Sequence, residues 1–223
     1  MIEVILCDDH ALIRRGIRDT LSDAPDIRVI GEAGDYGELR TLFRQITQPG
    51  APGAGRTTPC DVLVLDINLP GRSGLDVLHA LKDEGSPVKV LVVSMYPEDQ
   101  YAIRALKAGA YGYVNKGGDP QLIVQAVRTV AQGRKYVTPE IAQMLVESLT
   151  APSTELPHTK LSDRELQTLV MIASGKRLAD IAGELTLSPK TVSVYRARVL
   201  EKLGLANNAE LTVYAIRNGL VGE

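Results

Sequence analysis

Side chains that can bind or transfer an anion stand at or just after the ends of short apolar runs. They are two adjacent acids, Asp8 and Asp9, a third acid, Asp66, a hydroxyl, Ser94, and an amine, Lys116. Three carboxylates, a carbonyl oxygen and water are the hard oxygen ligands that Mg²⁺ takes in a six-coordinate site. Neighbouring carboxylates at an apolar strand end also repel each other, and a cation relieves that repulsion. The set therefore predicts a magnesium site.

The same set is suited to phosphoryl transfer. A carboxylate can act as the nucleophile and form an aspartyl-phosphate, after which transfer depends mainly on positioning and charge neutralisation. The metal and Lys116 would neutralise phosphoryl oxygens, and the Ser94 hydroxyl would donate to another. A simpler interpretation is that the acids only cap helices. That interpretation could explain any one acid, but it explains poorly why three acids, a hydroxyl and an amine all stand at strand ends. His10, His79 and His158 are scattered, so neither a serine-hydrolase triad nor a metalloprotease site is indicated.

Alternating apolar runs and amphipathic segments must position these residues. The runs predicted as strands are Glu3–Cys7, Ile27–Ala33, Val62–Ile67, Val88–Met95 and Ala110–Val114. Helical patterns lie at about 11–23, 35–46, 73–84, 98–108 and 119–132. Strand–helix alternation of this length predicts a doubly wound, five-stranded parallel sheet in an α/β domain. Ligands of such sheets bind beyond the carboxyl ends of the strands, where the candidate residues stand.

The remainder of the chain is predicted to be helical. Thr138-Pro139 can start a helix that ends near residue 149. Ser162 and Glu165 form a capping box for a helix over 162–174. Apolar spacing and caps predict three more helices, at about 178–185, at 189–203, and from Asn207 or Asn208 to about 218. We therefore expect an all-α domain of four helices behind the sheet.

Composition shifts divide the chain. We expect a first domain with its core at 1–122, extended by terminal helices to about 149, a polar linker at 150–160, and a second domain at 161–223. The Pro- and Gly-rich stretch inside 47–60 reads as a flexible loop. Residues 1–157 carry a net charge of −4 and residues 158–223 a net charge of +2, with +3 concentrated in 176–202. A basic segment of this size is most often a solvated helix face.

Several classes of protein are excluded by composition. No stretch of 18 apolar residues is present, so no transmembrane helix is expected. The N-terminus lacks the basic region of a signal peptide and meets the acids Asp8 and Asp9 within nine residues, so it does not resemble a signal peptide. Cys7 and Cys60 are too few for a disulfide scaffold or a cysteine zinc site. We therefore expect a cytoplasmic protein without a membrane partner.

Residues 1 to about 120 resemble the receiver domain of bacterial two-component response regulators, which has a flavodoxin-like fold. The resemblance rests on Asp8-Asp9, the stretch from Asp66 to Gly74, Ser94, and the stretch from Ala110 to Lys116. It implies that Asp66 accepts phosphate from the phosphohistidine of a sensor histidine kinase.

The resemblance also implies roles for the neighbouring residues. Asp9, Asp66 and the backbone carbonyl of Asn68 would bind Mg²⁺ directly, and Asp8 would act largely through water. Lys116 would contact the phosphoryl group, and Ser94 would reorient toward it. Tyr113 would turn inward as the coupled aromatic switch. One departure is Gly117, which follows the lysine where receivers commonly have a cis-proline, so this loop is expected to be looser.

The two central helices of the second domain follow a helix-turn-helix plan, in which the second helix enters the DNA major groove. On a wheel of 189–203, Val192, Val199 and Leu203 share a packing face, with Tyr195 at its edge. The groove-facing side holds Ser193, Val194, Ala197 and Arg198, and the flanks, where phosphates would lie, hold Lys190, Thr191, Arg196 and Lys202. The alternative from the wheel and charge alone is a three-helix interaction module.

The second domain resembles the LuxR-type DNA-binding domain. The matching residues lie at 161–165, 181–182, 187–192 and 202–204. With the receiver-like domain in front, the chain resembles a NarL/FixJ-family response regulator. The resemblance implies double-stranded promoter DNA and a homodimer as partners, and it allows contact with RNA polymerase.

The last predicted helix has apolar residues around most of its circumference, so we expect it to need two partners. One is its own domain, and the other is the same helix of a second protomer, through Leu211, Tyr214 and Ala215. The rival is burial within the monomer or against the first domain.

Two other functions stay open. An aspartyl-phosphate phosphohydrolase of the haloacid-dehalogenase type has similar chemistry, but its Asp-x-Asp motif is replaced here by Asp66-Ile67-Asn68. A regulator that ignores phosphorylation is disfavoured by the intact acidic set. We expect a transcription regulator that is not a metabolic enzyme, although the aspartyl-phosphate would hydrolyse slowly by itself.

Overall fold

The computed structural model describes residues 1–48, 58–96, 98–150 and 156–221, so most of the predicted 47–60 loop lies outside the described residues. The chain divides into two compact units, Met1–Thr150 and Ala151–Glu223. Each unit is described by itself.

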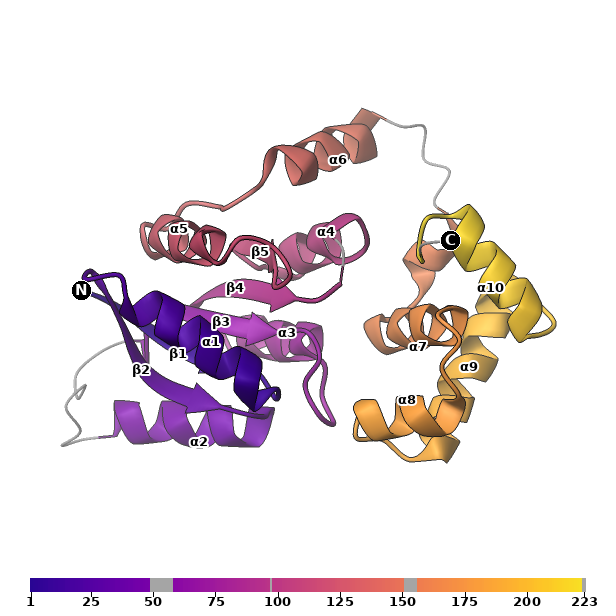
Figure 1. Cartoon of the computed structure of the whole chain (residues 1–223), viewed down its shortest axis with the longest axis horizontal. Coiled ribbons are helices and arrows are strands. Elements are labelled where there is room, and N and C mark those ends of the chain that lie inside the picture. The colour runs from indigo at the N-terminus through magenta and orange to yellow at the C-terminus, as the bar shows by residue number, and fades with distance from the viewer. Residues whose placement is uncertain (49–57, 97, 151–155, 222–223) are drawn as a thin grey trace. The chain divides into compact units, whose positions relative to one another are not determined.

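The first unit is built on a parallel sheet (Figure 1). Its strands are β1 (Ile2–Cys7), β2 (Ile27–Ala33), β3 (Val62–Asp66), β4 (Lys89–Ser94) and β5 (Gly112–Asn115). They pair in the order β2-β1-β3-β4-β5, and every pair is parallel. The predicted fold is confirmed, and the predicted strand ends differ by at most two residues. The central strands are continuously apolar because both of their faces are covered.

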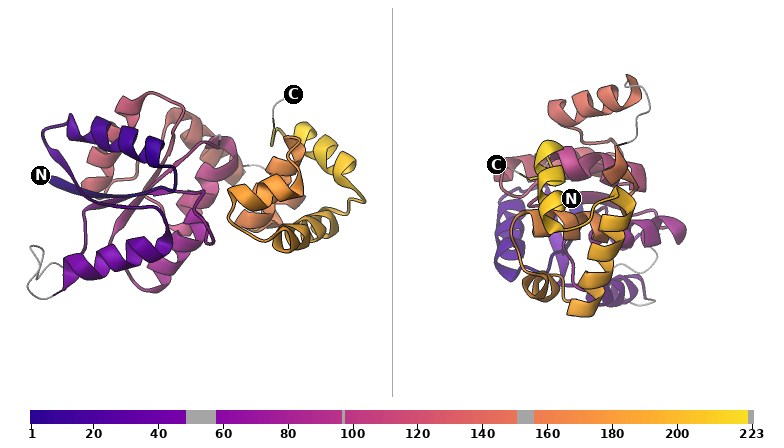
Figure 2. Two further views of the ribbon diagram at one scale, coloured as in Figure 1. Left: turned by 60° about the horizontal axis from the view of Figure 1, so that its bottom comes forward. Right: turned by 90° about the vertical axis from the view of Figure 1, so that its right-hand side faces the viewer.

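Helices cover both faces of this sheet (Figure 2, left). They are α1 (Ala11–Ser22), α2 (Tyr36–Thr47), α3 (Gly74–Asp83), α4 (Glu98–Ala108) and α5 (Pro120–Ala131); a further helix, α6 (Pro139–Thr150), packs on α4. Local sequence explains several helix starts. Ser73 and Asp76 form a capping box for α3, and Asp119 accepts a hydrogen bond from the backbone of Gln121 at the start of α5.

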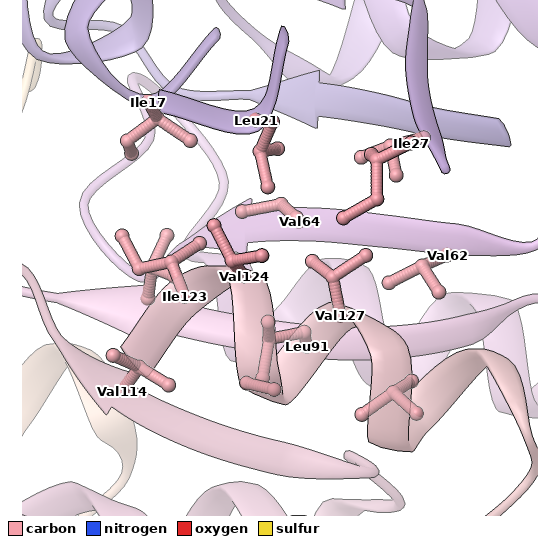
Figure 3. Close-up of a cluster of buried hydrophobic side chains, with 14 of the residues drawn as sticks. Ile17, Leu21, Ile27, Val62, Val64, Leu91, Val114, Ile123, Val124 and Val127 are labelled. Atoms are coloured by element: carbon pink, nitrogen blue, oxygen red, sulfur yellow. The ribbon is translucent and has the colours of Figure 1, made fainter. Parts of the chain in front are cut away.

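One hydrophobic layer lies between the sheet and the pair α1 and α5 (Figure 3). Side chains from both helices meet strand side chains there, and all of the set is buried: Ile17, Leu21, Val62, Val64, Leu91, Val114, Ile123, Val124 and Val127. This packing holds the carboxyl ends of β1, β3, β4 and β5 in fixed positions at one edge of the sheet.

The segment between α5 and α6 extends the sheet beyond β5. The backbone N–H of Tyr136 donates to the carbonyl of Tyr111 at 2.8 Å, and Tyr136 forms a parallel bridge with Gly112. A side chain at Gly112 would lie 2.9 Å from the Tyr136 backbone oxygen, so glycine is needed for this close approach. The following helix, α6, packs on α4 with Ile141 fully buried. We did not predict this extension.

The second unit contains a short 3-10 helix, η1 (Pro157–Lys160), and the helices α7 (Asp163–Ala173), α8 (Leu178–Glu184), α9 (Pro189–Leu203) and α10 (Asn208–Arg217). The predicted all-α domain and its capping box at Ser162 are present. The end of the segment predicted as a polar linker is helical, because η1 lies within 150–160, and η1 contacts α9.

Candidate functional site

Acidic side chains from two adjacent strands converge at the carboxyl edge of the sheet. Asp8 and Asp9 follow β1, and Asp66 is the last residue of the neighbouring β3. Asp8 and Asp66 are buried, and Asp9 is a quarter exposed. One ligand atom from each of these acids and one from His10 lie within 4.8 Å of one another. Carboxylate oxygens at this spacing fit the donor set of a small divalent cation.

The Lys116 ammonium lies among these acids. Its Nζ is 2.6 Å from Oδ2 of Asp8 and 2.8 Å from Oδ2 of Asp66, and only 3% of its side chain is exposed. The backbone N–H of Lys116 donates to the carbonyl of Ser94 at 2.8 Å, which ties the end of β5 to the end of β4. A buried ammonium between two buried carboxylates is the pairing expected where charges are removed from water.

Burial has an electrostatic consequence for the central acid. It raises the pKa of the Asp66 carboxyl to about 6; the Lys116 ammonium opposes this shift, and the Asp8 carboxylate adds to it. Asp66 is thus an ionisable group in an unusually dry position, which is typical of functional sites. Gly74 permits this arrangement, because a Cβ there would lie 2.0 Å from the backbone oxygen of Asp66.

Ser94 is the last residue of β4, which pairs with the strand that ends at Asp66, and Tyr113 lies in β5. Both side chains are buried. The Ser94 Oγ accepts a hydrogen bond from the backbone N–H of Tyr96 at 3.1 Å, and the Tyr113 hydroxyl donates to the carbonyl of Tyr96 at 2.7 Å. Tyr113 is already turned inward in this structure. Tyr96 therefore connects the two predicted switch residues, and its ring also stacks on Tyr101 of α4, with the ring centres 4.6 Å apart.

His10 and Asn68 lie at the margin of the site. His10 is more than half exposed, and its Nδ1 lies 2.6 Å from Oδ1 of Asp9, so it stands at the mouth of the site. Asn68 is partly buried, and its backbone hydrogen-bonds to Asp66. The other histidines lie outside the site: His79 is on α3, and the His158 Nδ1 is 3.0 Å from the Tyr214 hydroxyl in the second unit.

Sequence reasoning missed two contributors to this site. Arg14 of α1 donates to the backbone carbonyl of Asp8 and pairs with Glu32 of β2. Asn115 donates to the carbonyl of Tyr96 at 3.2 Å and accepts from the Gly117 backbone at 2.7 Å. Arg14 lies outside the motif stretches, whereas Asn115 lies in the stretch from Ala110 to Lys116, where its position beside Lys116 was a usable signal.

The second unit presents one side of α9 to solvent. Val192 and Val199 are fully buried, and Leu203 and Tyr195 are partly buried, as predicted. The predicted groove-facing side chains are all exposed: Ser193, Val194, Ala197 and Arg198. On the flanks, Lys190 is exposed and Thr191 is partly buried.

Two flanking cations have partners inside the second unit. Arg196 donates through Nε to the side chain of Asn208 at 2.5 Å, and the Lys202 Nζ lies 2.6 Å from a carboxylate oxygen of Glu165. Each cation is already bonded to a side chain of its own unit. To contact a DNA phosphate, the cation would have to leave that partner or bind both groups at once.

The last helix differs from the prediction made for it. Leu211 and Ala215 are fully buried in their own unit, where α10 packs on α7, so the prediction that they face a second protomer was wrong. Tyr214 is partly buried at its contact with His158. The large apolar side chains of α10 that are exposed are Val213 and Ile216. A groove of about 350 Å³ lies along this helix, lined by Leu205, Ala209, Val213, Tyr214 and the charged Glu210 and Arg217.

Over the described residues, no helix combines the length and apolarity needed to cross a membrane.

Comparison with known proteins places two family models on the chain. The response regulator receiver domain matches residues 4–128, and the luxR family of bacterial regulatory proteins matches residues 159–215. The chain is 39% identical to the response regulator UvrY of Escherichia coli (strain K12), covering 99% of this chain and 96% of UvrY. It is 38% identical to the response regulator GacA of Pseudomonas protegens, covering 99% of this chain and 98% of GacA.

A solved structure has a similar fold. RcsB from Salmonella enterica serovar Typhimurium, bound to promoter rprA in the presence of phosphomimetic BeF3⁻, matches with a TM-score of 0.60 and 25% identity, covering 96% of this chain and 97% of RcsB.

Proposed function

Because the chain belongs to the two-component response regulators that join a receiver domain to a LuxR-type DNA-binding domain, we propose that its signal is phosphorylation of Asp66. The supporting observation is the placement of Asp66, buried at the end of the central strand beside Asp8, Asp9 and Lys116. The receiver match does not favour the phosphohydrolase alternative. The protein is a transcription regulator and not a metabolic enzyme.

The transfer step uses the Asp66 carboxylate as nucleophile. One oxygen attacks phosphorus in the phosphohistidine of a sensor kinase, the P–N bond breaks, and the imidazole nitrogen leaves with the electron pair. Lys116 lies close enough to Asp66 to neutralise a phosphoryl oxygen, and burial keeps water from weakening that interaction. Slow attack of water on the aspartyl-phosphate returns the receiver to its starting state.

A Mg²⁺ ion fits this site by the chemistry of its donors. Asp9, Asp66 and the backbone carbonyl of Asn68 would hold it, and Asp8 would act through water. When bound, the ion supplies positive charge to the phosphoryl oxygens. Asp8 is also tied to Lys116, so the chain's own ammonium already balances part of the acidic charge.

Ser94 and Tyr113 would pass the signal to the loop between β4 and α4. Both are hydrogen-bonded to the backbone of Tyr96, so a reoriented Ser94 hydroxyl would release the Tyr96 N–H. This would shift the population of the two receiver states.

The output would be binding to promoter DNA by a cytoplasmic homodimer. Support comes from the exposed side of α9, where Ser193, Val194, Ala197 and Arg198 would meet base edges and Lys190 would lie nearer the phosphates. RNA polymerase is the expected partner at a promoter. Val213 and Ile216 replace the buried residues of α10 as candidates for the dimer contact.

Labelling with acetyl phosphate tests the phosphorylation site. Asp66→Asn should abolish Mg²⁺-dependent labelling, because an amide is not a competent nucleophile. Asp9→Ala should weaken Mg²⁺ binding while leaving the fold intact. Asp83→Asn, an exposed acid at the end of α3, is the matched control and should label like the natural protein. Undiminished labelling of Asp66→Asn would place the acceptor elsewhere.

A further inference from the structure

The loop that carries Lys116 is closed by the side chain of Asn115. The Asn115 Oδ1 accepts the backbone N–H of Gly117 at 2.7 Å, which makes a turn with Lys116 at its centre. The Asn115 Nδ2 donates to the carbonyl of Tyr96 at 3.2 Å, in the loop after β4. One side chain therefore closes the lysine loop and links it to the loop that follows Ser94.

Backbone hydrogen bonds complete this turn. The N–H of Gly118 donates to the carbonyl of Asn115 at 3.2 Å, and the N–H of Lys116 donates to Ser94 at 2.8 Å. A Cβ at Gly117 would lie 3.1 Å from the Asn115 Oδ1, so glycine leaves room for the side chain to close the turn. The loop that the sequence predicted to be loose is thus restrained by an amide side chain.

Restraint of the Lys116 backbone matters because the lysine side chain is long. Four methylenes separate its ammonium from Cα, and each rotatable bond must be fixed to keep the charge in one place. In the structure the ammonium lies 2.6 Å from Asp8 and 2.8 Å from Asp66. A mobile starting point for this side chain would spread the ammonium over several positions.

We infer that Asn115 is a positioning residue for phosphoryl transfer: by closing the turn with Gly117 it holds Lys116 where the ammonium reaches Asp66. The inference rests on the proposed phosphorylation of Asp66. The Asn115 side chain hydrogen-bonds to the backbone of Gly117 and of Tyr96, and it acts through the lysine.

Substitutions at Asn115 separate this role from a general structural one. Asn115→Leu has a similar size and removes the acceptor, whereas Asn115→Ser retains a short side-chain oxygen that can close the same kind of turn. Gln121→Ala is the matched control, because Gln121 is exposed in the first turn of α5 and its side chain takes no part in the turn. The wild-type protein and the three full-length variants are compared.

Three measurements are made on each protein: initial labelling rate with acetyl phosphate at saturating Mg²⁺, Mg²⁺ affinity by calorimetry, and amide exchange of Gly117 by NMR. We expect Asn115→Leu to label about tenfold more slowly, while Asn115→Ser and Gln121→Ala stay within about threefold of wild type. Mg²⁺ affinity should not weaken in any variant, because its ligands are untouched. The Gly117 amide should exchange faster only in Asn115→Leu.

Each contrary result has a defined meaning. Equal labelling of Asn115→Leu and wild type overturns the inference, and so does an equal loss in Asn115→Leu and Asn115→Ser. A matching loss of Mg²⁺ affinity would show that Asn115→Leu disturbs the whole site, which also overturns it. Absence of labelling in the wild-type protein would instead refute the proposed function, and the inference would fall with it.

Discussion

Replacing the buried acceptor carboxylate should make the receiver unit more stable. The pKa of Asp66 is raised from its ordinary value of 3.8 to about 6 by burial. The folded protein therefore binds this proton more tightly than the unfolded chain does. The stability that Asp66 contributes is fully present below about pH 4 and is lost as the pH rises through 6. Asparagine has no proton to lose, so the advantage of Asp66→Asn should grow across the same window.

The magnitude follows from the shift. A difference of about two pKa units at about 1.4 kcal/mol each amounts to roughly 3 kcal/mol above pH 7, in the absence of divalent cations. Asp66 is 2% exposed, so solvent screening reduces this little. Asp83→Asn, at an exposed acid, should change stability by less than about 0.5 kcal/mol.

Urea unfolding followed through the NMR amide signals of β1 and β3 reports the receiver unit alone. The experiment compares wild type, Asp66→Asn and Asp83→Asn at pH 4 and pH 7 in EDTA, and then in Mg²⁺. Mg²⁺ at a hundred times its dissociation constant should stabilise wild type by about 2.7 kcal/mol and Asp66→Asn by less. If Asp66→Asn is no more stable than wild type at pH 7, or its advantage is the same at pH 4, burial of this charge is not the dominant effect.

Three further outcomes follow from the site and from α9. Ser94→Ala should still be labelled but should show a smaller gain in DNA affinity on labelling, measured by fluorescence anisotropy; an unchanged gain would exclude Ser94 from the signal. Gly74→Ala should destabilise the receiver by about 1–3 kcal/mol in urea unfolding, because its Cβ would lie 2.0 Å from the backbone oxygen at the end of β3, whereas Gly183→Ala, with open space around it, should not destabilise. Val194→Ala should change the discrimination between bases by roughly 1–3 kcal/mol at one position per half-site. Lys190→Ala should weaken binding equally on specific and random duplexes, and it should reduce the slope of log affinity against log salt concentration by about 0.9. The reverse pattern would require α9 to be rotated in the groove.

Most of the receiver site could be predicted because strand ends and chemistry coincide in the sequence. A parallel sheet brings the carboxyl ends of its strands to one edge, so apolar runs that lead to Asp8, Asp66 and Lys116 specify their proximity. The helical wheel of α9 succeeded for a similar reason. Val192 and Val199 differ by seven residues, which is two turns, and both are buried.

The remaining features depend on tertiary contacts that no local pattern encodes. The pairing of Tyr136 with β5 needs the glycine at position 112, which lies before α5 in the chain, and the segment around Tyr136 has no strand-like alternation. On α10 the apolar residues surround the helix, so sequence alone could not tell which would be buried. Leu211 is buried and Ile216 is exposed because of how α10 packs on α7. Arg196 was assigned by the wheel without its partner Asn208, which belongs to the next helix.

The central claim is that phosphorylation of Asp66 controls DNA binding by the second unit. Its most direct test is the affinity of wild type and Asp66→Asn for a promoter duplex bound by the protein, titrated at one fixed salt concentration before and after incubation with acetyl phosphate and Mg²⁺. Wild type should bind more tightly after incubation, and Asp66→Asn should be unchanged. Equal tightening of both proteins, or tightening of neither when labelling of wild type is complete, would contradict the account.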